Sequence, residues 1–130
     1  MSIFVGGYLP EVNKDHIPEL EVSNKSILGL SNEYIIKEYT PISNQLHLSS
    51  CVGTSISDCL EILIGIKNPN NVKQVSKLFI YYNGRKLSGH LNQDSGTFIS
   101  SAMQGLVKYG VCLEETFPYN PKKVLKQPTI

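Results

Sequence analysis

Residues 45–51 read Gln45-Leu46-His47-Leu48-Ser49-Ser50-Cys51, and a helical pattern begins where this stretch ends. Apolar side chains then recur at spacings of three and four, at Val52, Ile56, Leu60, Leu63 and Ile64. This period places them on one face and predicts an amphipathic helix of about four turns, with Asp58 and Glu61 on the other side. Ser49 or Ser50 is positioned to cap the first turn, and the run Asn68-Pro69-Asn70-Asn71 ends the helix.

The chain has three cysteines, and Cys51 differs from the other two because it stands at the start of this helix. Unpaired backbone N–H groups and the helix dipole favour a thiolate at such a position. Cys59 borders the apolar face and Cys112 lies within an apolar triplet, so both are interpreted as buried small hydrophobic residues. The cysteine spacings, eight and 53 residues, match neither a disulfide framework nor a zinc-type Cys-x-x-Cys pair. We therefore expect no metal site and a reducing compartment.

Beyond the first helix, residues 75–82 form a short apolar and aromatic segment. Periodicity alone does not decide between helix and strand there. The dipeptide Asn83-Gly84 predicts a turn, and the polar, glycine-containing residues 84–96 predict a loop.

A further helix is expected from about Thr97 to Tyr109, with Gly110 as its C-terminal stop. Its apolar face comprises Phe98, Ala102, Leu106 and Val107. Glycine, proline and asparagine interrupt residues 1–44 so often that this part predicts an irregular N-terminal arm lying over a core. The chain after Pro118 has no periodicity. These patterns together predict a mostly helical chain with long loops.

Composition limits the classes of protein that the chain can represent. Its 130 residues suffice for one domain, and 41% hydrophobic with 18% charged residues is typical of a globular protein. A formal net charge of +1 and the lack of a basic patch give no sign of a nucleic-acid partner. No apolar run approaches the roughly 20 residues of a membrane span. The first residues lack the basic region of a signal peptide, so we expect no secretion and a cytoplasmic or virion-associated location.

The residues around Cys51 resemble those of papain-like cysteine peptidases. In that family a glutamine precedes the nucleophilic cysteine by six residues, as Gln45 precedes Cys51, and the cysteine opens a long central helix. Other stretches resemble blocks of the microbial and viral members, in the same order from about residue 6 to 120. They are Gly7-Tyr8-Leu9-Pro10-Glu11, Ser76-Lys77-Leu78-Phe79-Ile80-Tyr81-Tyr82-Asn83-Gly84-Arg85, Asp94-Ser95-Gly96 and Tyr109-Gly110-Val111-Cys112-Leu113-Glu114-Glu115-Thr116-Phe117-Pro118-Tyr119.

The resemblance implies an α+β family fold of two lobes, of which this chain, mostly α, is the helical left lobe with long loops and an N-terminal arm. Residues 1–44 would be the irregular arm, and residues 45–120 the left lobe with its central cysteine helix. Residues 121–130 would be a tail or the start of the connection between the lobes. Phe117-Pro118-Tyr119 would serve only in packing.

The resemblance also implies roles for single residues. Cys51 would be the nucleophile, and its backbone N–H would form an oxyanion hole with the side-chain amide of Gln45. Ser95 and Gly96 would bind substrate, because a glycine lets a peptide approach the main chain closely. Alternatively, Gly96 only turns the loop into the next helix. No cofactor is implied.

The sequence also departs from the family pattern. The family's catalytic histidine and asparagine lie roughly 130–150 residues beyond the cysteine, whereas only 79 residues (52–130) follow Cys51. His47, four residues before Cys51, is an alternative base at a family position that is normally a surface-loop residue. His16 and His90 are expected to be exposed. The family usually has glycine five and two residues before the cysteine, where Leu46 and Ser49 stand here.

A last departure concerns the disulfide of the secreted members. The resemblance puts Leu48 and Asp94 at its two positions, so that bridge cannot form in this chain.

Three functions are compatible with these features. The first is peptide-bond hydrolysis through a thioester on Cys51, the chain being the cysteine-bearing half of a peptidase. The second is a truncated, inactive module that binds or scaffolds, in a virus or phage particle for example. The third is an inhibitor or regulator that pairs with a peptidase. A peptide or protein substrate is the expected ligand, and we expect a partner chain or self-association to cover the apolar face that the other lobe would occupy.

Overall fold

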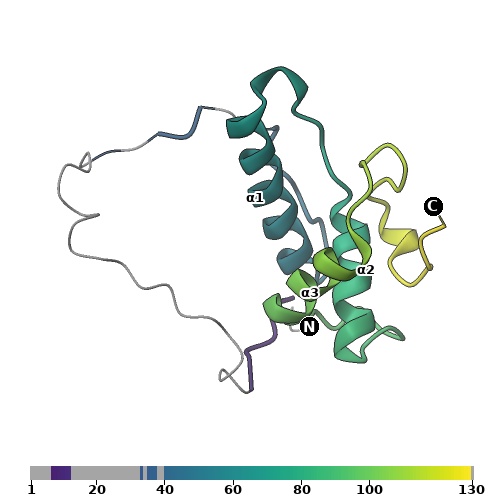
Figure 1. The fold of residues 1–130 in the computed structure, drawn as a ribbon. Coiled ribbons are helices and arrows are strands. Elements are labelled where there is room, and N and C mark those ends of the chain that lie inside the picture. The colour runs from purple at the N-terminus through teal and green to yellow at the C-terminus, as the bar shows by residue number, and fades with distance from the viewer. Residues whose placement is uncertain (1–6, 13–32, 34, 38–39, 130) are drawn as a thin grey trace, which may run out of the picture.

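The computed structural model describes residues 7–12, 33, 35–37 and 40–129. Its helices are α1 (Cys51–Lys67), α2 (Lys77–Ser88) and α3 (Ile99–Tyr109), with short 3₁₀ turns η2 (Pro69–Asn71) and η3 (Pro121–Lys123). Two isolated β-bridges, Tyr8 with Thr97 and Val75 with Leu113, are the extended pairings among the described residues. The prediction of a mostly helical chain is therefore confirmed (Figure 1).

The second helix lies at the centre of the fold, and its sequence explains why periodicity did not identify it. Residues 77–85 of α2 are all buried, so this stretch of the helix is buried on every side instead of on one face. Ser76 caps its start by accepting a hydrogen bond of 3.1 Å from the backbone N–H of Phe79. Left-handed Gly89, with φ of 79°, follows its end.

The turn predicted at Asn83-Gly84 is wrong, because both residues lie inside α2. Gly84 is needed for packing and not for a turn. A Cβ added there would lie 3.0 Å from the side-chain oxygen of Thr97 and 3.2 Å from the Cβ of Ala102 in α3. The glycine therefore lets α3 approach α2 closely, and the predicted loop begins only after Ser88.

The first helix spans the predicted residues, but the assignment of its faces is partly wrong. Its buried stripe comprises Gly53, Ser57, Glu61 and Gly65 at intervals of four. These mostly small residues let α1 lie close to α2, since a Cβ on Gly53 would be 2.7 Å from the carbonyl oxygen of Lys77. Glu61, predicted on the outer side, is 2% exposed, whereas Leu63 is 59% exposed.

Glu61 is buried because its carboxylate has specific partners. One oxygen accepts a hydrogen bond of 2.8 Å from the backbone N–H of Val75, and the other accepts one from the hydroxyl of Thr40. These bonds satisfy a charge that would otherwise be costly inside the fold. Cys59, expected to be buried, is exposed on the outer face of α1.

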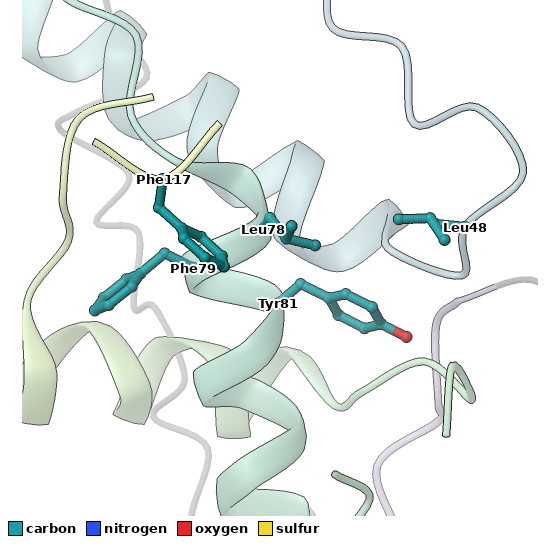
Figure 2. Close-up of a cluster of buried hydrophobic side chains, with 5 residues drawn as sticks. All are labelled: Leu48, Leu78, Phe79, Tyr81 and Phe117. Atoms are coloured by element: carbon teal, nitrogen blue, oxygen red, sulfur yellow. The ribbon is translucent and has the colours of Figure 1, made fainter. Parts of the chain in front are cut away.

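The core lies on two sides of α2. One cluster comprises Leu48, Leu78, Phe79, Tyr81 and Phe117. Figure 2 shows that it combines the loop before α1, α2 and the C-terminal segment, with the hydroxyl of Tyr81 pointing out of the cluster. The second cluster joins α1, α2 and α3 through Val52, Val75, Ile80 and Ala102.

A buried arginine fixes the C-terminal segment. Arg85 of α2 is fully buried and donates hydrogen bonds to the carbonyl oxygens of Gln93, at 2.7 Å, and Val124. Its guanidinium lies 4.3 Å from the centre of the Tyr81 ring. Burial lowers the pKa of Arg85 from its ordinary value. The hydrogen bond to Val124 thus holds the segment around η3 against α2.

Candidate active site

Cys51 is the first residue of α1 and is partly buried. It borders a cavity of ≈ 240 Å³ that is also lined by Tyr8, Val52, Ser55, Ile56 and Ile99. The N–H groups of a helix's first turn have no partner inside the helix. The thiol therefore combines backbone donors with an open, mostly apolar pocket.

The loop before Cys51 is tied to a tyrosine from the C-terminal segment. Ser50 occupies the N-cap position of α1, but its side chain makes no capping bond, so the predicted cap is absent. Its hydroxyl lies 2.5 Å from the hydroxyl of Tyr119, which donates a 2.7 Å hydrogen bond to the carbonyl oxygen of Gln45. Tyr119 therefore does more than pack, contrary to the interpretation from sequence.

Glu114 in turn holds Tyr119. Its carboxylate accepts a 2.6 Å hydrogen bond from the Tyr119 backbone N–H, so it is not a merely solvated charge. The ammonium of Lys77 lies 5.5 Å from the centre of the Tyr119 ring. Burial raises the pKa of the Tyr119 hydroxyl, which stays protonated at neutral pH.

Gln45 is half-buried at the start of the same loop. Its side-chain nitrogen donates one hydrogen bond of 2.9 Å to the carbonyl oxygen of Leu48. An amide nitrogen carries two protons, so a second donor remains for a ligand. The oxyanion role of Gln45 stays a prediction.

Leu46 has the backbone conformation of a glycine. Its φ is 54°, in the left-handed region that residues with a Cβ seldom adopt. The family pattern expected a glycine at this position for a sharp turn, and the turn forms here with leucine. The Leu46 side chain is 55% exposed, so it gains little from burial in return.

Hydrogen bonds through Asp94 connect the loop before Cys51 with the loop before α3. Both oxygens of Asp94 lie 3.1 Å from the backbone N–H of Ser49, and one accepts a 2.6 Å bond from the Tyr81 hydroxyl. That hydroxyl accepts a 3.0 Å bond from the N–H of Gly96. Burial, together with the bond to Asp94, raises the pKa of Tyr81. These bonds connect the two loops that a disulfide joins in the secreted members.

Residues near the N-terminus lie along the backbone that follows Gly96. The N–H of Thr97 donates to the carbonyl oxygen of Gly7 at 3.0 Å, and the N–H of Leu9 donates to the carbonyl oxygen of Thr97 at 3.1 Å. Glu11 accepts bonds of 2.9 Å from both the N–H and the hydroxyl of Ser100. An extended segment, residues 7–11, thus pairs with the start of α3.

Glycine is required where this segment crosses the site. A Cβ on Gly7 would lie 1.8 Å from the carbonyl oxygen of Ser49, and one on Gly96 would lie 2.3 Å from that of Gly7. Gly96 also has φ of 84°. Its N–H is bonded to Tyr81, so the backbone that pairs with an extended chain is that of Thr97. Ser95 has a buried hydroxyl without a hydrogen-bond partner among the described residues.

His47 and His90 take no part in the hydrogen bonds described above. His47 is exposed on the loop before α1, and its role as a base stays a prediction. His90 is half-buried, with its ring centre 6.3 Å from that of Phe98, and was expected to be exposed. His16 lies outside the described residues.

The described residues contain no group of three or more His, Cys, Asp or Glu side chains arranged to hold a metal ion. Across those same residues, no helix has the length and apolar character needed to cross a membrane.

Comparison with known proteins supports one class. The chain is 35% identical over 83 residues to an uncharacterised peptidase C1-like protein of Acanthamoeba polyphaga mimivirus, which is 64% of this chain and 27% of that protein. The crystal structure of xylellain, a cysteine protease from Xylella fastidiosa, matches with a TM-score of 0.82 and 26% identity. That match covers 95% of this chain and 51% of xylellain. No family model matches the sequence.

The helical lobe, with a cysteine at the start of its first long helix, shares the fold of the matched half of xylellain. Both matches support a papain-like cysteine peptidase family for this chain. It spans about half the length of xylellain and about a quarter of the viral relative.

Proposed function

We propose that this chain is the nucleophile-bearing lobe of a cysteine peptidase and that Cys51 attacks the carbonyl carbon of a peptide bond. One observation carries the proposal. An extended backbone already pairs with Thr97 beside the pocket that Cys51 lines, and Tyr8 of that backbone lines the same pocket. A peptide held in this way would present carbonyl groups close to a thiol.

The proposed chemistry needs a base, two donors and water. A base removes the thiol proton, and sulfur bonds to the carbonyl carbon while the oxygen becomes an oxyanion. The N–H of Cys51 and the side-chain amide of Gln45 would stabilise that oxyanion. The proton then passes to the departing amine as the C–N bond breaks and a thioester remains. Water hydrolyses the thioester, releasing the acid and restoring the thiol.

The base and the residue that orients it are proposed to lie outside these 130 residues. The chain corresponds to 51% of xylellain, so about half of that protease has no counterpart here. A base contributed by that second part would face the open side of the Cys51 pocket. His47 is the alternative within this chain.

Residues 7–9 cover the backbone edge at Thr97 that a peptide substrate would use. Because residues 7–9 occupy the N–H and carbonyl groups of Thr97, a substrate using this edge would first have to displace them. Two hydrogen bonds from Ser100 to Glu11 hold the segment in place.

An activated ester tests the proposed thioester directly. The p-nitrophenyl ester of an N-blocked amino acid should acylate Cys51, and hydroxylamine should remove the acyl group. Intact mass and peptide mapping would locate the adduct. Cys51→Ser should abolish it, whereas Cys59→Ser, a matched change on the same helix, should not. Acylation of Cys59 instead of Cys51 would refute the proposal.

A second candidate, a module that binds a partner through an apolar face, is favoured by one feature of α3. Ile99, Met103 and Val107 recur at intervals of four and are 48%, 50% and 90% exposed. The prediction that Val107 shares a face with buried Ala102 is therefore wrong. A helix face of this kind is typical of a protein interface. We propose that a partner chain or a second copy covers it. Sedimentation velocity should show association that Val107→Glu weakens and that the control Lys108→Glu leaves unchanged. A protein that stays monomeric at all concentrations, and with which no partner is recovered, would contradict this candidate.

A further inference from the structure

We infer that Tyr119 is a positioning residue for the oxyanion site, an inference that rests on the proposed function. Its hydroxyl contacts both ends of the loop that connects Gln45 to Cys51. At one end it donates a hydrogen bond of 2.7 Å to the carbonyl oxygen of Gln45, and at the other it lies 2.5 Å from the hydroxyl of Ser50. The two proposed oxyanion donors belong to Gln45 and to Cys51, the residue after Ser50.

The direction of these hydrogen bonds follows from the groups involved. A carbonyl oxygen only accepts, so the single hydroxyl proton of Tyr119 is committed to Gln45. Ser50 must therefore donate its own proton to the Tyr119 oxygen. The result is a chain from Ser50 through Tyr119 to Gln45. Ser50 is fully buried, so water does not substitute for this contact.

Tyr119 suits this role because it is itself firmly held. Its backbone N–H is bonded to Glu114 at 2.6 Å, and Phe117, two residues earlier, is buried in the core cluster beside Phe79. The residues that it joins are 69 and 74 positions away in the chain. Tyr119 thus connects the loop to the core, in addition to the hydrogen bonds that form within the loop.

The loop needs such a support. Leu46 adopts a left-handed conformation that is unfavourable for a residue with a Cβ, so the backbone preference of leucine opposes this turn. The Gln45 side chain also bonds to Leu48 within the same loop. Without the Tyr119 hydroxyl, the carbonyl of Gln45 keeps only the 3.2 Å hydrogen bond from the N–H of Leu48, which lies in the same loop. The separation between the Gln45 amide and the Cys51 N–H is then no longer fixed by the core.

Tyr119→Phe tests the inference, because it removes one oxygen and keeps the ring. A peptide aldehyde forms a thiohemiacetal whose oxygen uses the oxyanion donors, whereas 4,4′-dithiodipyridine reacts at sulfur and makes no oxyanion. We expect the variant to bind the aldehyde about tenfold more weakly. Its reaction at Cys51 with the disulfide reagent, followed by peptide mapping, should change less than about twofold.

Two further variants sharpen the result. Tyr109→Phe makes the same chemical change at a tyrosine whose ring lies beneath Lys86 and Lys108, and it should leave aldehyde affinity unchanged. Gln45→Ala should also weaken aldehyde binding. Adding Tyr119→Phe to Gln45→Ala should reduce the aldehyde affinity much less than Tyr119→Phe does in the wild type, because both changes act on one donor. Should Tyr119→Phe fail to fold, Ser50→Ala breaks the same chain of bonds at its other end and should weaken aldehyde binding in the same selective way.

Each remaining outcome overturns the inference. Equal aldehyde affinity in the wild type and Tyr119→Phe would show that the hydroxyl does not position the donors. An equal loss with both reagents would show a purely structural role. If the wild type forms no aldehyde adduct although iodoacetamide modifies Cys51, the proposed function fails first and the positioning role with it.

Discussion

The carboxylate of Asp94 accepts a 2.6 Å hydrogen bond from the hydroxyl of Tyr81, and this contact fastens the loop before Cys51 to the loop before α3. The Asp94 carboxylate also accepts a hydrogen bond from the backbone N–H of Ser49, and the Tyr81 hydroxyl accepts one from the backbone N–H of Gly96. Two backbone groups beside the candidate site are thus satisfied by one pair of side chains.

Tyr81→Phe should destabilise the protein by about 1–3 kcal/mol, because it leaves the buried N–H of Gly96 without an acceptor. Chemical denaturation monitored by circular dichroism would measure the loss. Tyr109→Phe serves as the matched control and should change the free energy of unfolding little. A loss no larger than that of the control would contradict the proposed connection between the loops.

The same tyrosine predicts a pH dependence. Burial and Asp94 raise its pKa in the folded state above the ordinary value of 10.0. Above that pH the unfolded chain loses the proton while the folded protein keeps it, so the stability present at lower pH is lost as the pH rises. The free energy of unfolding should therefore fall above about pH 10, and less steeply in Tyr81→Phe. Parallel slopes in the two proteins would contradict this.

Leu46→Gly should stabilise the fold by up to about 1 kcal/mol, because glycine adopts a positive φ without a Cβ clash. Glycine's greater freedom in the unfolded chain offsets part of that gain. Leu46→Ala keeps a Cβ and is the control, with an expected change near zero. Thermal unfolding would rank the three proteins, and a glycine variant less stable than the alanine variant would refute the prediction.

Arg85→Met should lower the free energy of unfolding by about 3 kcal/mol or more, since it removes two hydrogen bonds from a buried guanidinium to the carbonyl oxygens of Gln93 and Val124. Arg85→Lys should recover little, because one ammonium lacks the planar fork that reaches both oxygens. Urea unfolding would measure both variants. Full rescue by lysine would show that charge alone suffices.

Glu11→Ala should release residues 7–11 from α3, because it removes two acceptors of Ser100. Hydrogen exchange at the Thr97 amide should then become faster, and modification of Cys51 by a peptidyl epoxide should increase. Val12→Ala changes a 93% exposed neighbour and should alter neither quantity. Unchanged exchange at Thr97 in Glu11→Ala would show that the segment is held by other contacts.

Sequence patterns identified α1 and α3 because each begins or ends at a recognisable signal, such as Gly110 after α3. They did not identify α2, whose buried surface has no period. They also misassigned Glu61 and Leu63, since the buried stripe of α1 consists of small residues and one hydrogen-bonded acid. Apolar periodicity misleads when close helix packing selects for size.

For the candidate site, the spacing of Gln45 and Cys51 was informative because both lie in one short loop. The contacts that hold this loop were not predictable in the same way. Tyr119 and Asp94 reach it from 74 and 45 residues away, and Glu11 reaches Ser100 from 89 residues away. Tertiary structure alone brings such pairs together. Only the Leu46 position, where the family pattern has a glycine, gave a local sign of the unusual backbone.

The central claim is that Cys51 is a nucleophile in a peptide-binding site. It is tested most directly by treating the protein, alongside Glu11→Ala, with a peptidyl epoxide at neutral pH and mapping the modified cysteine by mass spectrometry. Cys59 is exposed, and burial raises the pKa of Cys112, so the chain contains its own controls. We predict that the epoxide modifies Cys51 before Cys59 and more rapidly in Glu11→Ala, while iodoacetamide modifies Cys59 readily as well. Epoxide labelling of Cys59 at least as fast as Cys51 in both proteins, or no labelling of a Cys51 that iodoacetamide does modify, would contradict the claim.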